Sequence, residues 1–220
     1  EEARGMKIFR MLDKDFSGVL EISALDGLAS GALGKEMLAV LDSNGDGVVS
    51  SSEWLAYLAL TKNGKGESFL TKFVDAMEGK LGERLGEAAG LDAMRSGGSI
   101  SEVARAAVEA ATSVGVSKED AAVIAGEAAG GAVIARGGTR EEARRAAADA
   151  ATDAGGSVSA QAAVAGSVVE KNGGSVDEVV AAAAEVAVAG GASKEVLAAV
   201  AGAAAGAAVV AHGGSAGDAA

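Results

Sequence analysis

The sequence predicts an all-α protein in two parts: a small helix–loop–helix pair over residues 1–63 and a series of helical hairpins over residues 64–220. The first part contains two acidic loops flanked by apolar residues at helical spacing. In the second part, double glycines recur every 36 or 40 residues, and each precedes a residue that favours a helix start. All six aromatic residues lie in the first third of the chain, and this change in composition separates the two parts.

The first acidic loop, Asp13–Ala24, is incomplete as a cation site. Its candidate ligands are side-chain oxygens at positions one, three, five and nine and the carbonyl at position seven: Asp13, Asp15, Ser17, Glu21 and Val19. Position six is Gly18, but position twelve is Ala24, so the loop lacks a carboxylate that could bind through both oxygens. We therefore predict weak or vestigial metal binding in this loop.

The second acidic loop, Asp42–Glu53, has a complete set of oxygen donors. Its six candidate metal ligands are Asp42, Asn44, Asp46, the Val48 carbonyl, Ser50 and Glu53. A hard cation such as Ca²⁺ takes about six to eight oxygens. Gly47 permits the sharp bend, and Glu53 falls on the first turn of the following helix, where both carboxylate oxygens can bind. This spacing predicts one Ca²⁺ site.

The order of ligands in Asp42–Glu53 resembles the calcium-binding loop of the EF-hand family, and Asp13–Ala24 is similar to a second such loop. The resemblance covers about residues 3–62 and implies a paired domain with one competent site and one largely structural site. Leu20 and Val49 both occupy the eighth position of their loops. We expect them to pair in a short antiparallel ladder that couples the two loops. Trp54, which follows the second loop, is interpreted as a core residue.

The second part of the chain is a repeat. The expected hairpin units are 64–98, 99–138, 139–174 and 175–214, each about 36 to 40 residues long. Residues 215–220 are expected to be the truncated start of a further unit. A hydroxyl residue follows each double glycine, and a glutamate three positions later completes a capping box at Ser99, Thr139 and Ser175. Within the second unit, Gly115 and Ser117 predict a break between helices over residues 99–112 and 118–136.

Alanine and glycine dominate these units. Alanine favours helix, whereas each internal glycine costs about 1 kcal/mol relative to alanine. Glycines at equivalent places, such as Gly130 and Gly206, are therefore expected to permit close helix packing. The hairpins could form an α-solenoid-like stack or a bundle. The alternative is a disordered alanine- and glycine-rich tail, against which the periodic capping boxes argue.

Composition restricts the function. The formal net charge of −12 argues against a nucleic-acid partner and is compatible with a cation or a basic partner. There is no cysteine, and the only histidine is His212, which is expected to lie near the C-terminus of the last helix. No phosphate-binding loop is present. We therefore predict that the protein is not an enzyme.

The last hairpin, 175–214, is the most apolar, and residues 196–211 carry no charge. This uncharged run is shorter than the roughly 20 residues of a membrane span, so no transmembrane helix is expected. Burial against a partner or within the array is the preferred interpretation. Ala204 and Ala208, one helical turn apart, are expected to lie on the contact surface.

These observations predict a calcium-binding structural, scaffold or interaction protein within a larger assembly. One alternative is an accessory subunit docked on a membrane complex through the apolar final hairpin. Another is a calcium sensor that acts on a target helix. The compartment is not indicated, although the start at Glu1 leads us to expect a processed N-terminus and an organellar or secretory route.

Overall fold

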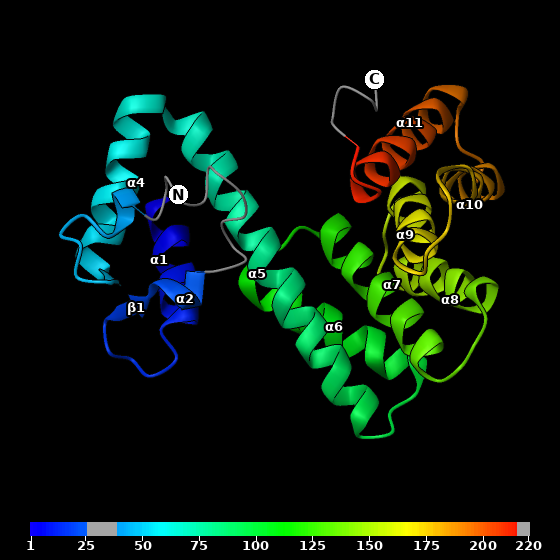
Figure 1. Cartoon of the computed structure of the whole chain (residues 1–220), viewed down its shortest axis with the longest axis horizontal. Coiled ribbons are helices and arrows are strands. Elements are labelled where there is room, and N and C mark those ends of the chain that lie inside the picture. The colour runs from blue at the N-terminus through cyan, green and yellow to red at the C-terminus, as the bar shows by residue number, and fades with distance from the viewer. Residues whose placement is uncertain (26–38, 215–220) are drawn as a thin grey trace. The chain divides into compact units, whose positions relative to one another are not determined.

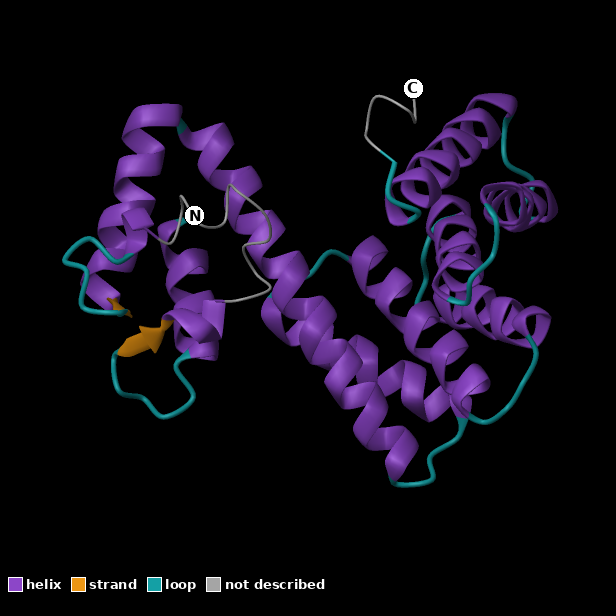
Figure 2. Ribbon diagram, in the orientation of Figure 1, coloured by secondary structure: helices purple, strands orange, loops and turns teal. Residues whose placement is uncertain are grey.

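The structure is a computed structural model that describes residues 1–25 and 39–214. It confirms the all-α prediction: the chain is 77% helical, with one small two-stranded sheet in the described residues (Figure 2). The chain divides into two compact units, residues 1–82 and 83–220, which are described separately below. The expected start of a further hairpin at 215–220 lies outside the described residues.

The first unit contains both acidic loops (Figure 1). Its elements are α1 (Glu2–Leu12), β1 (Val19–Glu21), α2 (Ile22–Leu25), β2 (Val48–Ser50), α4 (Ser51–Lys65) and the beginning of α5 (Glu67–Arg95). The two strands are antiparallel, with Leu20 opposite Val49. The predicted ladder between the two loops is therefore confirmed.

A compact aromatic and aliphatic core fixes the positions of these strands. Trp54 on α4 is fully buried, as predicted, and its indole nitrogen donates a hydrogen bond of 2.9 Å to the carbonyl of Gly5 on α1. Gly5 allows α1 to approach α4, because a Cβ there would lie 2.5 Å from a methyl carbon of Leu58. Leu20 and Val49 are buried with these residues. The ladder is thus anchored to the core of the unit.

The hairpin expected in 64–98 is wrong. Helix α4 ends at Lys65, and Gly66 has a φ of 88°, which an L-residue rarely adopts. From there α5 continues for 29 residues without a break. No serine or threonine lies between Thr71 and Ser96 to cap a second helix start. The division between the compact units, after residue 82, falls inside α5, whereas the sequence-based boundary after residue 63 falls inside α4.

The second unit contains three complete helical hairpins, in agreement with the units predicted at 99–138, 139–174 and 175–214. Their helices are α6 (Ile100–Val114) and α7 (Lys118–Ala135), α8 (Arg140–Asp153) and α9 (Val158–Lys171), and α10 (Val176–Ala189) and α11 (Lys194–Ala211). Each helix packs against the next, and α7, α9 and α11 also contact one another in order. The hairpins therefore stack in series, as in a solenoid.

Local sequence sets the boundaries of these helices. The three predicted capping boxes are present: at each, a hydroxyl caps the helix and the glutamate three residues later accepts the backbone N–H of the capping residue, as at Ser99, Thr139 and Ser175. Ser117, Ser157 and Ser193 cap the second helices. The breaks between helices therefore follow from caps that the sequence alone can specify.

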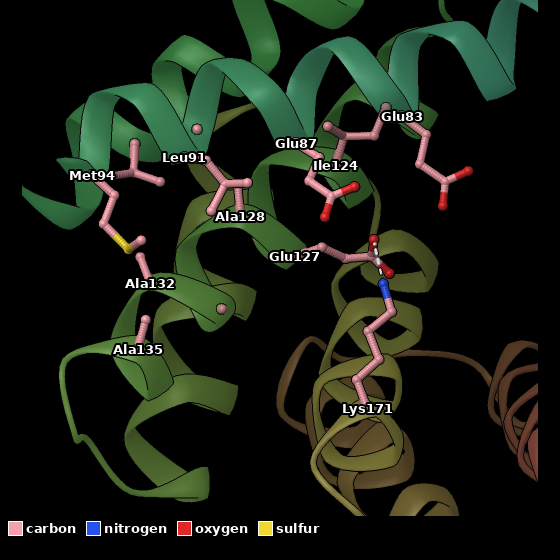
Figure 3. A pocket seen from close by; sticks show the side chains of 13 residues that line it. Glu83, Glu87, Leu91, Met94, Ile124, Glu127, Ala128, Ala132, Ala135 and Lys171 are labelled. Carbon is pink, nitrogen blue, oxygen red and sulfur yellow. Dashed lines mark ion pairs between the residues drawn. The ribbon is translucent and has the colours of Figure 1, made fainter. Parts of the chain in front are cut away.

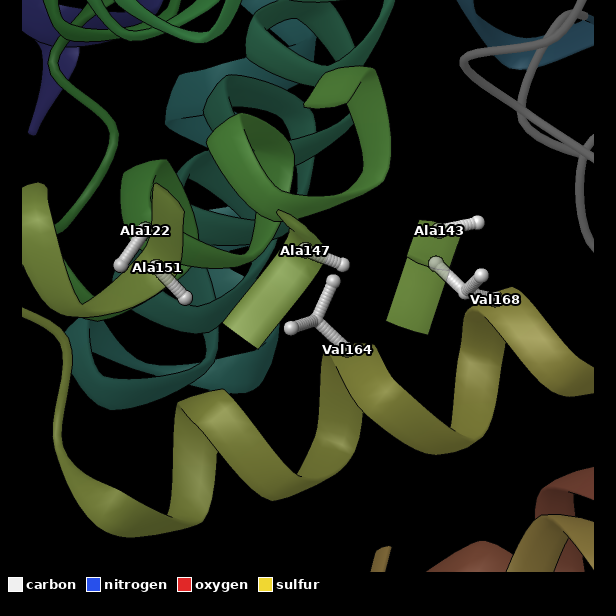
Figure 4. Packing of buried hydrophobic residues seen from close by; sticks show 6 residues of the cluster. All are labelled: Ala122, Ala143, Ala147, Ala151, Val164 and Val168. Atoms are coloured by element: carbon white, nitrogen blue, oxygen red, sulfur yellow. The ribbon is translucent and has the colours of Figure 1, made fainter. Parts of the chain in front are cut away.

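Glycine and alanine allow close packing inside the stack. A Cβ at Gly130 would lie 2.7 Å from a methyl carbon of Val168, so the predicted role of this glycine is confirmed. A Cβ at Gly126 would lie equally close to Val164 and to the Ala147 carbonyl. Figure 4 shows the resulting cluster, in which Val164 and Val168 of α9 approach alanines of α8. Small residues thus replace large side chains as the means of packing.

Candidate metal centre

The second loop is held together by hydrogen bonds to its first aspartate. One carboxylate oxygen of Asp42 accepts from the backbone N–H groups of Gly45 at 2.8 Å and Asp46 at 3.1 Å. The other oxygen accepts from Gly47 at 3.0 Å. Gly45 and Gly47, at positions four and six, have φ values of 73° and 88°. Their left-handed conformations turn these N–H groups toward Asp42.

The first loop repeats this arrangement. The Asp13 carboxylate accepts from the backbone N–H groups of Ser17 and Gly18, both at 2.9 Å, which are again positions five and six. Positions four and six are again left-handed, with φ values of 57° at Phe16 and 78° at Gly18. The strained Phe16 therefore occupies the place of Gly45, a match that sequence reasoning missed because phenylalanine does not favour this conformation.

Position three also behaves alike in the two loops. Asn44 accepts from the N–H of Asp46 at 2.9 Å, and Asp15 accepts from the N–H of Ser17 at 3.2 Å. The hydrogen bonds to Ser17 lower the pKa of Asp15. Only in the second loop does the residue at position three also bond to a carboxylate at position five, because the Asn44 amide donates to Asp46 at 2.9 Å.

The loops differ most at position twelve. Glu53 accepts four hydrogen bonds: from the backbone and hydroxyl of Ser43, both at 3.0 Å, and from the backbone and hydroxyl of Ser50, at 2.9 and 2.7 Å. The Ser50 bonds, backbone first, together with the weaker Ser43 bond, lower the pKa of Glu53 to about 2. Glu53 therefore stays ionised at neutral pH, caps α4 and connects the two ends of the loop.

The remaining predicted ligands lie on or beside the ladder. Val48 and Val19, whose carbonyls were predicted as donors, begin β2 and β1. The Ser17 hydroxyl already donates to the Val19 carbonyl at 3.1 Å. Glu21 ends β1, is exposed and accepts from the Ser23 hydroxyl at 3.2 Å. The first loop thus uses its own oxygen atoms in internal hydrogen bonds.

The carboxylates are not gathered around a common point in this structure. Across residues 1–25 and 39–214, no three aspartate, glutamate, histidine or cysteine side chains are arranged so that they could hold a metal ion. Instead, Asp42, Asp46 and Glu53 face N–H and hydroxyl donors of their own loop. The structure brings these residues into one loop, and Ca²⁺ binding stays a prediction.

The donor set nevertheless fits a hard cation by its chemistry. A carboxylate has about four acceptor sites, and Asp42 accepts three hydrogen bonds while Asp46 accepts two, so both keep capacity for an ion. Glu53 accepts four, but two of these come from the hydroxyls of Ser43 and Ser50, which can rotate away. Binding through Glu53 would require that rotation.

A separate cavity of about 290 Å³ lies in the second unit, where residues of α5, α7 and α9 meet (Figure 3). One end is apolar and includes Leu91 and Met94, and the other carries Glu83 and Glu87. Glu127 there pairs with Lys171 at 2.8 Å. The sequence did not predict this cavity, because its lining comes from helices far apart in the chain.

The side of α11 that carries Ala204 and Ala208 faces inward, not outward as predicted. Ala208 is fully buried in a cluster with Val169, Val179 and Ala182, and Ala204 packs against the same cluster. The expected contact strip through Ala204 and Ala208 is therefore wrong, because this side of α11 faces the rest of the array. Ala203 and Ala207 lie on the exposed side.

By length and composition, α11 is the one helix in the described part of the chain that could cross a membrane. Its mean hydropathy is 1.6 over 18 residues, and 11% of that window is buried. His212 follows directly, with Nδ1 2.7 Å from the Ala208 carbonyl, at the predicted place beside the helix C-terminus. The expectation that the chain has no transmembrane helix stays a prediction.

Comparisons of this chain with protein-family models, with curated proteins and with solved structures find no match. The likeness of the acidic loops to EF-hands therefore rests on their residues.

Proposed function

We propose that the protein is a calcium-binding structural or interaction protein within a larger assembly, with an EF-hand-like first unit. The observation that supports this proposal most is the equivalence of the two acidic loops. In both, the first aspartate binds the N–H groups of positions five and six, and positions four and six are left-handed. The loops are joined through Leu20 and Val49. Such paired loops are suited to placing oxygen atoms around a cation.

In this proposal, one Ca²⁺ per chain binds to the second loop. The ligands would be the carboxylates of Asp42, Asp46 and Glu53, the amide oxygen of Asn44, the Val48 carbonyl and the Ser50 hydroxyl. Bound Ca²⁺ would offset two of the three negative charges that these carboxylates carry. Glu53 lies on α4 and Asp42 precedes β2, so the bound ion would also connect the loop to the core of the first unit. Ligand binding to the folded state alone stabilises that state.

The first loop has a structural role in this proposal. The Asp13 side chain is largely buried and accepts hydrogen bonds from the backbone N–H groups of Ser17 and Gly18. Position twelve is alanine, so nothing there can replace the Glu53 carboxylate. The loop holds β1 beside β2 without an ion.

Calorimetric titration of the metal-free protein with Ca²⁺ tests the proposal. We expect one site with a dissociation constant on the order of 10⁻⁷ to 10⁻⁵ M. Glu53→Gln should abolish the measured heat, whereas Asp15→Asn, a matched removal of one charge in the first loop, should leave it unchanged. A wild-type protein that binds no Ca²⁺ would contradict the proposal, provided that circular dichroism shows it is folded.

A second candidate function is that of an accessory subunit docked on a membrane complex through the final hairpin. The exposed, uncharged side of α11 favours it, since little of this apolar helix is buried. Ala203→Glu with Ala207→Glu would place two charges on that side. If the candidate is correct, the double variant dissociates from the native membrane fraction and keeps its calcium affinity. Equal retention of wild type and variant would contradict it.

A further inference from the structure

Ion pairs connect the first helices of the last two hairpins. Arg140 of α8 approaches Glu178 of α10 at 4.0 Å. One turn further along, Arg144 approaches Glu185 at 3.3 Å, and only 18% of the Arg144 side chain is exposed. Two arginines four residues apart on α8 therefore pair with two acidic residues on α10.

The preceding pair of helices, α6 and α8, lacks these arginines. Counted from the helix caps, Ile100 and Ala104 of α6 stand where α8 has Arg140 and Arg144. The acidic row persists, because Asp149 of α8 stands where α10 has Glu185. The two interfaces thus share an acidic residue at this position, but α6 has no arginine at either of the positions that Arg140 and Arg144 occupy on α8.

A groove of about 440 Å³ occupies the interface between α6 and α8. Its apolar lining is Ile100, Ala104, Val108, Ala125, Ala150 and Ala154. Ala125 of α7 is fully buried, and Ala104 and Ala150 are nearly so. Because alanine side chains are short, a helix lying in the groove could approach the backbone closely.

The rims of the groove are charged and exposed. Asp149 and Asp153 stand one helical turn apart on α8, and Arg105 stands on α6. Among the residues that the structure describes, neither aspartate makes an ion pair. The groove therefore presents an apolar floor with two negative charges on its α8 rim and one positive charge on its α6 rim.

We propose that this groove binds an amphipathic α-helix of a partner protein. The helix would lay small apolar residues on the alanine floor and present two basic residues, four positions apart, to Asp149 and Asp153. Arg140 and Arg144 are spaced in this way, and Arg144 pairs with Glu185 of α10, the residue that corresponds to Asp149. This proposal names a partner class for the interaction role proposed above and does not depend on Ca²⁺.

Charge selects among the possible occupants. With a net charge of −12, a second copy of the chain would be repelled, and so would a nucleic acid. A basic helix would be attracted, and each exposed ion pair would strengthen binding by up to about fivefold at low salt. The alanine floor adds area without large anchors, so binding should be moderate and sensitive to salt.

The experiment uses the full chain and a fluorescent peptide of about 18 residues, long enough to form helix. The peptide carries an alanine and leucine face and two lysines four positions apart along one edge. The control peptide keeps the apolar face and replaces both lysines by glutamate. Fluorescence anisotropy should show saturable binding of the basic peptide and no binding of the acidic one.

Two variants with equal charge change locate the binding. Asp149→Asn with Asp153→Asn should weaken binding about five- to tenfold. Asp177→Asn with Glu195→Gln, which removes two exposed charges from α10 and α11, should leave it unchanged. Both pairs change exposed residues, so both variants should keep the wild-type helical content.

Three outcomes would overturn the proposal: no binding by the wild type, equal binding of both peptides, or an equal loss in both variants. A dimer of the chain that the peptide displaces would overturn the choice of occupant. Calcium titration of the same sample separates the two proposals. Protein that binds Ca²⁺ but no peptide contradicts only the groove, and protein that binds peptide but no Ca²⁺ contradicts only the metal site.

Discussion

In both acidic loops, an aspartate at position one organises the turn, but only the second loop has a glutamate that joins its two ends. Asp13 and Asp42 bind backbone N–H groups at the same two positions. Glu53 adds four hydrogen bonds that the first loop cannot make at position twelve. The comparison teaches that the two loops share the residue that sets the path of the backbone and differ in the residue that connects the ends of the loop.

The largest expected effect separates the loops by ion affinity. Asp42→Asn removes one carboxylate from the proposed site but keeps an acceptor for the loop N–H groups, so Ca²⁺ affinity should fall about tenfold or more. Asp13→Asn is the matched change in the first loop and should leave the affinity within about twofold. Titration with a calcium-sensitive competitor dye measures both. Equal losses would show that the loops share the ion.

The next effect concerns stability without Ca²⁺. Asp13→Ala removes the acceptor of two backbone hydrogen bonds from a largely buried position, so the free energy of unfolding should fall by about 1–3 kcal/mol. Urea denaturation in the presence of chelator measures this. A loss below about 0.5 kcal/mol would show that the first loop does not support the fold.

Position four offers a reciprocal test of backbone equivalence. Phe16 has a φ of 57° and an exposed side chain, so Phe16→Gly should relieve strain and stabilise the metal-free unit by about 1 kcal/mol or less. Gly45→Ala in the second loop should destabilise it by a similar amount. Chemical denaturation compares them. Changes of the same sign would contradict the matched geometry.

The smallest effect concerns the capping boxes of the second unit. Bonding to the backbone N–H of Ser99, Thr139 and Ser175 lowers the pKa of Glu102, Glu142 and Glu178. A lowered folded-state pKa stabilises the fold above the unfolded value of about 4.3, and this contribution is lost as pH falls below it. Helicity should therefore melt at lower temperature as pH falls from about 5 to about 3. This decrease in melting temperature should be smaller in the Glu142→Gln variant, which lacks one of the three carboxylates.

Features set by neighbouring residues could be predicted from the sequence. The caps at Ser99 and Ser175 and the pairing of Leu20 with Val49 depend on short motifs, and all are present. The continuous α5 was missed because every repeat unit was expected to contain two helices, although no serine or threonine between Thr71 and Ser96 marks a second helix start.

Features set by distant packing could not be predicted. The inward position of Ala208 depends on contacts with α9 and α10, since residues 203–207 before it are all alanine or glycine and give no sign of which side faces inward. The groove beside Asp149 depends on the separation of α6 and α8. The conformation of Phe16 is imposed by the loop against the preference of its side chain.

Glycine amide resonances give the most direct test of the claim that one ion binds and binds to the second loop. Gly47 and Gly18 occupy position six of their loops and donate to Asp42 and Asp13. During a Ca²⁺ titration followed by NMR, the Gly47 amide should shift and saturate at one equivalent, with no further change in either resonance in excess Ca²⁺. The claim is contradicted if neither amide shifts, or if Gly18 responds to a second equivalent.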